Sequence, residues 1–349
     1  MRILNSILGD ATGGRWRVVC DYSRVLAAHG HEVALLVGRK QRDLSAVPAG
    51  LPVVLIRNRG HYDFPAAWVA RRRLRGFAPD LAIVHCSRSV ALLKRALCGA
   101  APVVAVSHSN KVRRLLPADG YLALTGYIRD RLLSERARGR PAKPCFVIPN
   151  MIPLEPGEGL PDRPLRRPPR IAALGRFDRV KGLDLFVRAL GQLRQQGVAF
   201  TAVLGGAGPE AQRLERLAAE LGLQQQLRFP GWVDEPMAFL SQVDLLCVPA
   251  RSDAFGLTPL QGAAAGVPLV LSAASGHRAM FEPDREALFA ETGDACSLAH
   301  QMARLLGDPA LAEGLRTAAF DRVRQCYSVS AVAPRLLYAL EKIHENFIF

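Results

Sequence analysis

Short apolar runs alternate with longer amphipathic stretches along most of the chain. In the first half the apolar runs predict buried strands, and the stretches with apolar residues at helical spacing predict helices. The predicted strands there are 2–8, 31–37, 53–56, 81–85, 103–107, 120–124 and 145–148. The predicted helices are 16–29 and 65–75. This alternation argues for a parallel sheet with helices on both faces.

A stretch rich in proline, glycine and charge, residues 153–169, separates the two halves and is typical of an interdomain linker. The alternation then restarts. Strands are predicted at 171–174, 201–204, 227–229, 245–249 and 269–271, and helices at 183–195, 209–221, 237–242 and 260–265. The tail, 310–349, is predicted to be helical with a break near 327–330. Two α/β halves of this kind place ligands at the carboxyl ends of their strands.

The length and the cysteines fit this picture. A chain of 349 residues suits two domains of about 150 residues each. The seven cysteines form no C-x-x-C pair and have no histidine at a metal-ligand spacing, which favours buried free thiols in a reducing cytoplasm. The beginning of the chain lacks the layout of a signal peptide. The most apolar window, 257–274, is interrupted by proline, glycine and glutamine, so we expect no membrane span.

The net charge of +15 is unevenly distributed. Residues 1–150 hold 25 Lys and Arg against 9 Asp and Glu, whereas the rest of the chain is nearly neutral. The first half should therefore attract a polyanion, such as an anionic membrane surface, a phosphorylated acceptor or nucleic acid. The basic clusters have no aromatic residues interleaved within them, and no recognition motif is present, which argues against nucleic acid. The alternative is a solvated basic face with no partner.

Residues 250–272, ARSDAFGLTPLQGAAAGVPLVLS, form the most informative segment. A strand ends in a polar turn, a helix of small residues follows, and Gly266 and Pro268 end that helix. The start of such a helix exposes free backbone N–H groups, and the helix dipole adds partial positive charge there. The segment therefore predicts a site for a phosphate or another anion.

Two further loops support an anionic ligand. Arg176 and Lys181 follow the strand predicted at 171–174, where a guanidinium fork and an ammonium can together neutralise a diphosphate. Gly13 and Gly14 follow the first strand and would let the backbone approach a ligand, although a tight turn is an equal alternative. Neither these glycines nor those at 205–208 form a dinucleotide fingerprint, and no Walker motif is present.

Taken in order, these segments resemble the large group 1 family of retaining glycosyltransferases of GT-B fold. The resemblance extends over nearly the whole chain and is more specific in the second half. It implies an α/β protein with two Rossmann-like domains that face each other across a cleft. The implied parts are an acceptor domain at 1–155, a linker at 156–170, a nucleotide-sugar domain at 171–328 and a helix at 329–349 that packs back on the first domain.

The resemblance also implies roles for individual residues. Arg176 and Lys181 would hold the donor diphosphate, Asp253 would touch the donor sugar, and His108 would lie near the sugar and the acceptor, unless it only bonds to local backbone. The remaining implied donor-site residues are Gly13, Gly14, Gly231, Val233, Phe255, Gly256, Leu257, Thr258 and Gln261. Cationic side chains and a helix terminus would supply the positive charge, so we expect neither a metal nor a cofactor.

One departure from the family bears on activity. The E-x7-E pattern of the family appears here as Asp253 and Gln261. Asp253 keeps the charge but is one methylene shorter, and Gln261 keeps hydrogen bonds but has lost the charge. Each charged bond forgone would cost on the order of 1 kcal/mol. A catalytically weak or inactive nucleotide-sugar-binding homologue is therefore the alternative.

We accordingly expect a retaining, metal-independent glycosyltransferase that uses a nucleoside-diphosphate sugar. The expected acceptor is a lipid-linked or lipopolysaccharide-type glycan. The expected location is the cytoplasm, with peripheral association on the inner membrane face through the basic first half, and no nucleic acid is expected to bind.

Overall fold

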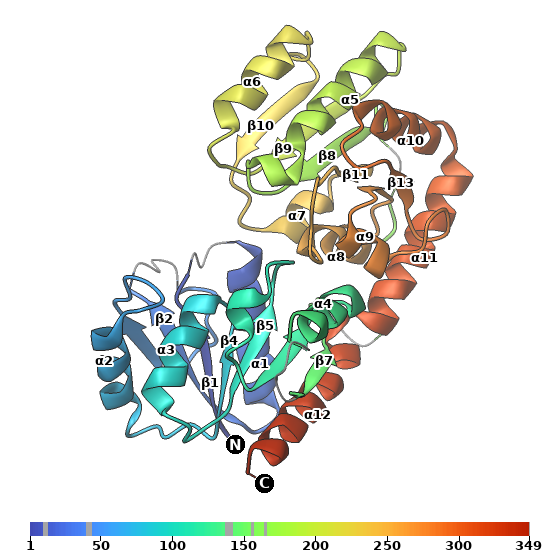
Figure 1. Cartoon of the computed structure of the whole chain (residues 1–349). Coiled ribbons are helices and arrows are strands. Elements are labelled where there is room, and N and C mark those ends of the chain that lie inside the picture. The colour runs from blue at the N-terminus through green and yellow to red at the C-terminus, as the bar shows by residue number, and fades with distance from the viewer. Residues whose placement is uncertain (10–12, 40–43, 137–141, 155–156, 164–165, 349) are drawn as a thin grey trace. The chain divides into compact units, whose positions relative to one another are not determined.

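The structure is a computed structural model that describes residues 1–9, 13–39, 44–136, 142–154, 157–163 and 166–348. The chain divides into two compact units, shown in Figure 1. Unit 1 comprises Met1–Met151 and Val329–Phe349, and unit 2 comprises Ile152–Ser328. Each unit has its own sheet and is described by itself.

Unit 1 is built on a parallel sheet of seven strands in the order β3-β2-β1-β4-β5-β6-β7. The central strands are apolar and buried throughout, as expected where helices cover both faces. The strands are β1 (Arg2–Ile7), β2 (Glu32–Gly38), β3 (Val53–Ile56), β4 (Leu81–Val84), β5 (Val103–Ser107), β6 (Gly120–Ala123) and β7 (Cys145–Val147).

The helices of unit 1 follow its strands in turn (Figure 1). Asp63 caps the start of α2 (Phe64–Leu74) by accepting a hydrogen bond from the Ala66 amide. A proline in the first turn of α2 also suits a helix start. The helices are α1 (Gly14–Ala28), α2 (Phe64–Leu74), α3 (Ser87–Leu97), the 3₁₀ turn η1 (Arg113–Leu115), α4 (Gly126–Arg136) and α12 (Val329–Ile348).

The last helix, α12, packs on the edge of the unit 1 sheet although it lies at the other end of the chain. A Cβ atom on Gly120 of β6 would lie 2.9 Å from the Ile343 side chain, so glycine here lets that side chain pack directly on the β6 backbone. Arg335 donates a hydrogen bond to the Val147 carbonyl at 3.0 Å. Ile343 itself is buried, which fixes this face of α12 in the core of unit 1.

Unit 2 is built on a parallel sheet of six strands in the order β10-β9-β8-β11-β12-β13. Its apolar core lies between this sheet and the helices along it (Figure 1). The strands are β8 (Arg170–Leu174), β9 (Thr201–Gly205), β10 (Leu227–Gly231), β11 (Leu245–Val248), β12 (Leu269–Ser272) and β13 (Leu288–Ala290).

The helices of unit 2 again follow the strands. The stretch predicted to be a linker also bonds to this unit. Arg163 donates a hydrogen bond to the Leu240 carbonyl, and Arg166 donates one to the Asp244 carboxylate. The helices are the 3₁₀ turn η2 (Arg179–Lys181), α5 (Leu183–Gln195), α6 (Ala211–Glu220), α7 (Pro236–Leu240), α8 (Leu257–Ala264), α9 (Ser275–Met280), α10 (Ala295–Gly307) and α11 (Pro309–Cys326).

The predicted alternation is confirmed, but the ends of some elements differ and the helices α3, α4, α9 and α10 were not predicted. All twelve predicted strands are present, and the tail is broken after Cys326 as predicted. Helix α8 begins at Leu257 and not at 260, because Pro259 is accommodated in its first turn, where no intrahelical N–H is needed. Strand β13 was not predicted, since three residues are too few to show a period.

Candidate functional site

The loop after β8 carries the two cations predicted to bind a diphosphate. The Arg176 guanidinium donates to the Asp178 carboxylate, with Nε 2.7 Å from Oδ2. The other oxygen of Asp178 accepts from the Lys181 amide at 3.2 Å and so caps η2. Gly182 follows with φ +65°, and a side chain there would collide with the Pro249 carbonyl. The turn therefore fixes the position of the Lys181 backbone.

Lys181 and Asp253 meet although 72 residues separate them. Lys181 Nζ lies 2.7 Å from Asp253 Oδ2, and the Phe255 amide donates to Oδ1 of the same carboxylate at 3.3 Å. The Asp253 side chain is only 11% exposed. Burial raises the pKa of Asp253, but the charge and hydrogen bond of Lys181, the charge of His277 and the Phe255 amide together outweigh burial, and the pKa ends below its usual value. Asp253 is thus a charged carboxylate at neutral pH.

A second ion pair ties the loop of Asp253 to the loop of Lys181. Arg251 holds both oxygens of Asp184 at 2.6 and 2.8 Å, and its amide donates to the Val180 carbonyl at 2.9 Å. A bidentate pair of this kind fixes orientation as well as distance. Sequence reasoning did not single out Arg251 or Asp184, because their partnership appears only when the two strand ends lie side by side.

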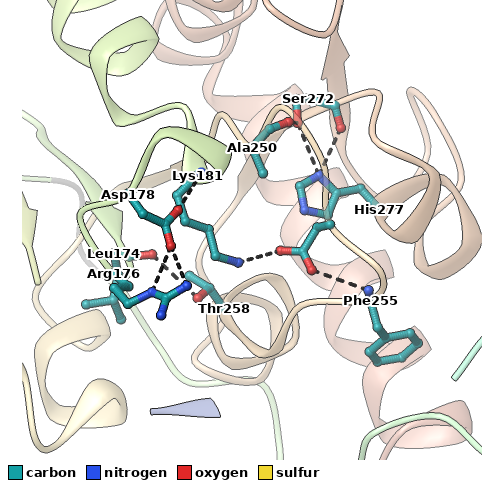
Figure 2. A network of polar contacts seen from close by, with 10 residues as sticks. Leu174, Arg176, Asp178, Lys181, Ala250, Phe255, Thr258, Ser272 and His277 are labelled. Atoms are coloured by element: carbon teal, nitrogen blue, oxygen red, sulfur yellow. Dashed lines mark hydrogen bonds and ion pairs between the residues drawn. The ribbon is translucent and has the colours of Figure 1, made fainter. Parts of the chain in front are cut away.

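The first turn of α8 lies at the same edge of the sheet. Thr258 Oγ1 lies 3.5 Å from the Leu174 carbonyl at the end of β8 (Figure 2). Gly262 lets α8 pack close to β11 and β12, since a side chain there would collide with Leu246. The positive end of the α8 dipole therefore faces the carboxyl ends of β8 and β11. Leu257 and Thr258 supply the amides of this first turn.

The other residues predicted for the donor site are more dispersed. Gly231 ends β10, and its carbonyl accepts from Gly206 at 2.7 Å, while Val233 packs against Gly205. The Phe255 side chain is buried against Tyr327, so only its backbone faces the Asp253 carboxylate. Gln261 lies one turn into α8, and Gly256 is the N-cap of that helix.

His277 is a buried member of this network that the sequence prediction missed. It follows β12 in the short helix α9, and its Nδ1 donates to the Ser272 carbonyl at 2.9 Å. Its Nε2 has no hydrogen-bond partner among the described residues. Burial lowers the pKa of His277 although the charge of Asp253 opposes this, so the ring is neutral at pH 7. A histidine just after a predicted strand is the sequence signal that was available.

The remaining predicted site residues belong to unit 1. His108 follows β5, and its Nε2 lies 2.8 Å from Nδ1 of His85, which follows β4. The two rings stack with centroids 5.1 Å apart. Burial, helped by the nearby Arg15 guanidinium, lowers the pKa of His108 to about 3. Gly13 is the N-cap of α1 and Gly14 its first residue, next to Arg15, so this helix start lies near His108.

The pair of His85 and His108 predicts a pH dependence of stability. The unfolded chain takes up a proton at each histidine near pH 6.5, whereas folded His108 resists protonation down to about pH 3. Stability is therefore full above about pH 6.5 and is lost as the pH falls below that value. We expect His108→Gln to lose less stability than the wild type between about pH 6.5 and 5, measured by thermal unfolding. Parallel pH profiles of the two proteins would contradict this.

The described residues contain no group of three or more His, Cys, Asp or Glu side chains placed to hold a metal ion. None of the helices in the described part of the chain combines the length and the apolar character needed to cross a bilayer.

Two family models match the chain. The one described as "Glycosyltransferase Family 4" matches residues 12–156, and the one described as "Glycosyl transferases group 1" matches residues 163–322. Together they extend over most of both units.

Two curated relatives are similar to this chain over about half and about three quarters of its length. The "Lipopolysaccharide core biosynthesis glycosyltransferase LpsD" of Rhizobium meliloti is 32% identical over 167 residues, which are 48% of this chain and 48% of that protein. The "D-inositol 3-phosphate glycosyltransferase" of Salinispora tropica is 28% identical over 302 residues, which are 76% of this chain and 61% of that protein. The chain thus spans between about half and three fifths of the length of these relatives.

Among solved structures, Anabaena Alr3699/HepE in complex with UDP and glucose superposes on the chain with a TM-score of 0.80 at 16% identity. The superposition covers 97% of this chain and 99% of that one. At this identity the likeness shows the fold, which is GT-B with two Rossmann-like domains. The family models and the fold agree, and the chain belongs to the group 1 glycosyltransferases.

Proposed function

We propose that the protein is a retaining glycosyltransferase that moves a sugar from a nucleoside-diphosphate sugar to an acceptor and needs no metal ion. The proposal rests on one observation: Lys181 and Asp253 meet beside Arg176 and the first turn of α8, at the carboxyl edge of the unit 2 sheet. Cations beside unpaired helix amides suit a diphosphate. HepE, whose structure contains UDP and glucose, supports a ligand of this class.

Each group has a definite task in the proposed reaction. Arg176, Lys181 and the amides of Leu257 and Thr258 stabilise the charge that develops on the departing diphosphate. Lys181 keeps two N–H donors for phosphate oxygens while the third holds Asp253. Asp253 accepts hydrogen bonds from sugar hydroxyls. In retention the leaving phosphate takes the acceptor's proton on the same face of the sugar.

The proposed acceptor is a lipid-linked or lipopolysaccharide-type glycan at the cytoplasmic face of the membrane. The basic excess of residues 1–150 supports an anionic acceptor or surface. LpsD, the Rhizobium relative, is a lipopolysaccharide core glycosyltransferase by its name. The proposal can be tested by supplying candidate acceptors with UDP, GDP and ADP sugars and by following the anomeric configuration of the product by NMR. An inverted product, or transfer abolished by EDTA, would disprove retention or metal independence.

A thermal-shift screen with the same three nucleotides identifies the donor. A ligand at a hundred times its Kd is expected to stabilise unit 2 by about 2.7 kcal/mol. Lys181→Ala serves as the control, because it removes a cation of the proposed site. An equal shift in the variant would place the nucleotide elsewhere.

Gln261 favours the second candidate, an inactive binder of nucleotide sugars. It stands where the family pattern has a carboxylate, so a donor contact of about 1 kcal/mol is forgone. We expect Gln261→Glu to bind the donor about fivefold more tightly, measured by calorimetry. Gln212→Glu on the exposed side of α6 makes the same charge change and should have no effect. A Gln261→Glu variant that gains sugar transfer where the wild type has none would establish the inactive homologue.

A further inference from the structure

Large exposed aromatic side chains gather on a short segment of unit 1. Tyr62, Phe64 and Trp68 have 81%, 63% and 63% of their surface exposed. With Leu55, they make four of the eleven large hydrophobic side chains exposed in the described residues. Aromatic rings usually stabilise a fold by being buried. Four exposed apolar side chains within fourteen positions therefore indicate a surface with a partner.

Arginines hold these rings in place. The Arg95 guanidinium lies 4.7 Å from the ring centroid of Phe64 and 5.8 Å from that of Tyr62. Arg95 is itself fixed, since it donates to the His61 carbonyl at 2.6 Å. Arg72 lies 5.9 Å from the Trp68 ring. Aromatic rings mixed with guanidinium groups are typical of surfaces that sit at the level of lipid headgroups.

A cavity of about 560 Å³ lies on another side of the same helix, α2. Four arginines line it: Arg39 after β2, Arg57 and Arg59 after β3, and Arg73 from the last turn of α2. The other lining residues are Leu55, Ile56, Asp63, Pro65, Ala66 and Val69. Its volume is in the range of small-molecule sites, so it can take a phosphate-bearing group.

The charge of the cavity is strongly positive. Asp63 is its acidic lining residue, and both of its oxygens are occupied by backbone amides, that of Arg59 at 2.7 Å and that of Ala66 at 3.0 Å. These hydrogen bonds lower the pKa of Asp63 and direct its charge to the helix start. The cavity thus has four guanidinium groups and one carboxylate, and the oxygens of that carboxylate already accept hydrogen bonds from backbone amides. This composition suits an anion with several oxygens.

We propose that the part of unit 1 around α2 docks the protein on an anionic membrane, with the aromatic rings at headgroup level and lipid phosphates in the arginine cavity. We call it the α2 surface, made up of Tyr62, Phe64, Trp68, Arg39, Arg57, Arg59 and Arg73. The cavity and the exposed rings both border α2. A soluble phosphate ligand would need the cavity but not the rings, whereas a membrane would use both. The inference rests on the proposed function only in that a lipid-linked acceptor gives the docking a purpose.

The first test measures insertion of Trp68. The chain has three tryptophans, of which Trp16 is buried, so in a Trp232→Phe background Trp68 is the exposed reporter. Vesicles of phosphatidylcholine with phosphatidylglycerol should shift its emission to the blue and protect it from aqueous quenchers. Vesicles of phosphatidylcholine alone should do neither, and added salt should reverse the binding. No change in Trp68 emission on bound protein would overturn the proposal.

The second test compares matched variants by vesicle flotation. Arg57→Gln with Arg59→Gln should weaken binding about fivefold per arginine, which is about 1 kcal/mol each. Arg129→Gln with Arg131→Gln removes the same charge from α4, and we expect at most a twofold change there. Phe64→Ser with Trp68→Ser should weaken binding, whereas Tyr338→Ser on α12 should not. Equal losses in the two arginine variants would show that net charge alone attracts the protein and would refute a defined surface.

A third comparison separates the lipid from other sources of phosphate and from the reaction itself. Glycerol phosphate in solution should compete with vesicles only weakly, and full displacement by it would make the cavity a soluble-ligand site. The thermal shift with UDP should be unchanged in every α2-surface variant, because none of the residues proposed to bind the donor belongs to the α2 surface. Wild-type protein that docks through the α2 surface yet transfers no sugar would refute the proposed function and leave this inference intact. Wild-type protein that transfers sugar but does not dock through the α2 surface would refute this inference and leave the proposed function intact.

Discussion

Lys181→Ala is expected to lower the rate of sugar transfer about 10²- to 10³-fold. A preorganised donor aimed at developing charge is worth this much when it is removed. Lys181 is such a group, because the turn at Gly182 and the ion pair with Asp253 fix it before any ligand binds. The measurement is kcat with saturating donor, after the fold of the variant has been checked by circular dichroism.

The same substitution leaves Asp253 as an unpaired, nearly buried carboxylate, so stability should also fall, by about 1–3 kcal/mol. A second variant separates the two effects. Lys181→Ala with Asp253→Asn removes the unpaired charge and should recover most of the stability, but not the activity. If activity returned with stability, Lys181 would be a structural residue and the diphosphate assignment would be wrong.

A matched control exists in unit 1. Lys94 pairs with Asp119 at 2.8 and 2.9 Å, and the exposure of that pair, 31% and 16%, is close to the 33% and 11% of Lys181 and Asp253. Lys143 Nζ also lies 3.6 Å from Asp119, so Lys94→Ala should lower stability by a smaller amount. It should leave kcat unchanged, because Lys94 and Asp119 belong to no part of the proposed site.

Local pattern predicted the strands well because most of them are short, buried, apolar runs. Parallel strands covered on both faces show such runs clearly. It missed β13, which has three residues, and the mostly polar helix α4. It also missed α3 and α10, although both have buried apolar residues at helical spacing. The resemblance to the glycosyltransferase family implied that Arg176, Lys181 and Asp253 belong to one site, and all three follow strands whose ends share one edge.

What local pattern could not predict is how the side chains at that edge are paired. Arg251 with Asp184 and Lys181 with Asp253 join loops far apart in the chain, and nothing in either segment specifies the partner. His277 was missed for the same reason: its importance comes from burial beside Asp253, which only the packing of α9 creates. The structure thus adds the neighbours that hold Asp253, and Gly276 is one of them.

Gly276→Ala is expected to damage both stability and activity. A Cβ atom on Gly276 would lie 2.6 Å from the Phe255 nitrogen and 2.7 Å from the Asp253 carbonyl oxygen, and these backbone atoms cannot rotate away. The Gly276 amide also donates to that carbonyl at 3.1 Å, so the added methyl would push apart a bonded contact. Forced overpacking typically costs about 1–3 kcal/mol, and we expect a loss at the upper end.

The displaced segment is the one that carries Asp253, so the rate should fall further than stability alone explains. A shift of about 1 Å in a catalytic group can cost on the order of 10²-fold. We expect kcat to drop by about that factor at a temperature where Gly276→Ala is still folded. Gly314→Ala in α11 is the control: no atom lies within 4 Å of the new methyl, and helix propensity should raise stability by up to about 1 kcal/mol. Normal kcat in folded Gly276→Ala would show that sugar transfer tolerates movement of the Asp253 loop, and Asp253 would then have no place among the catalytic residues.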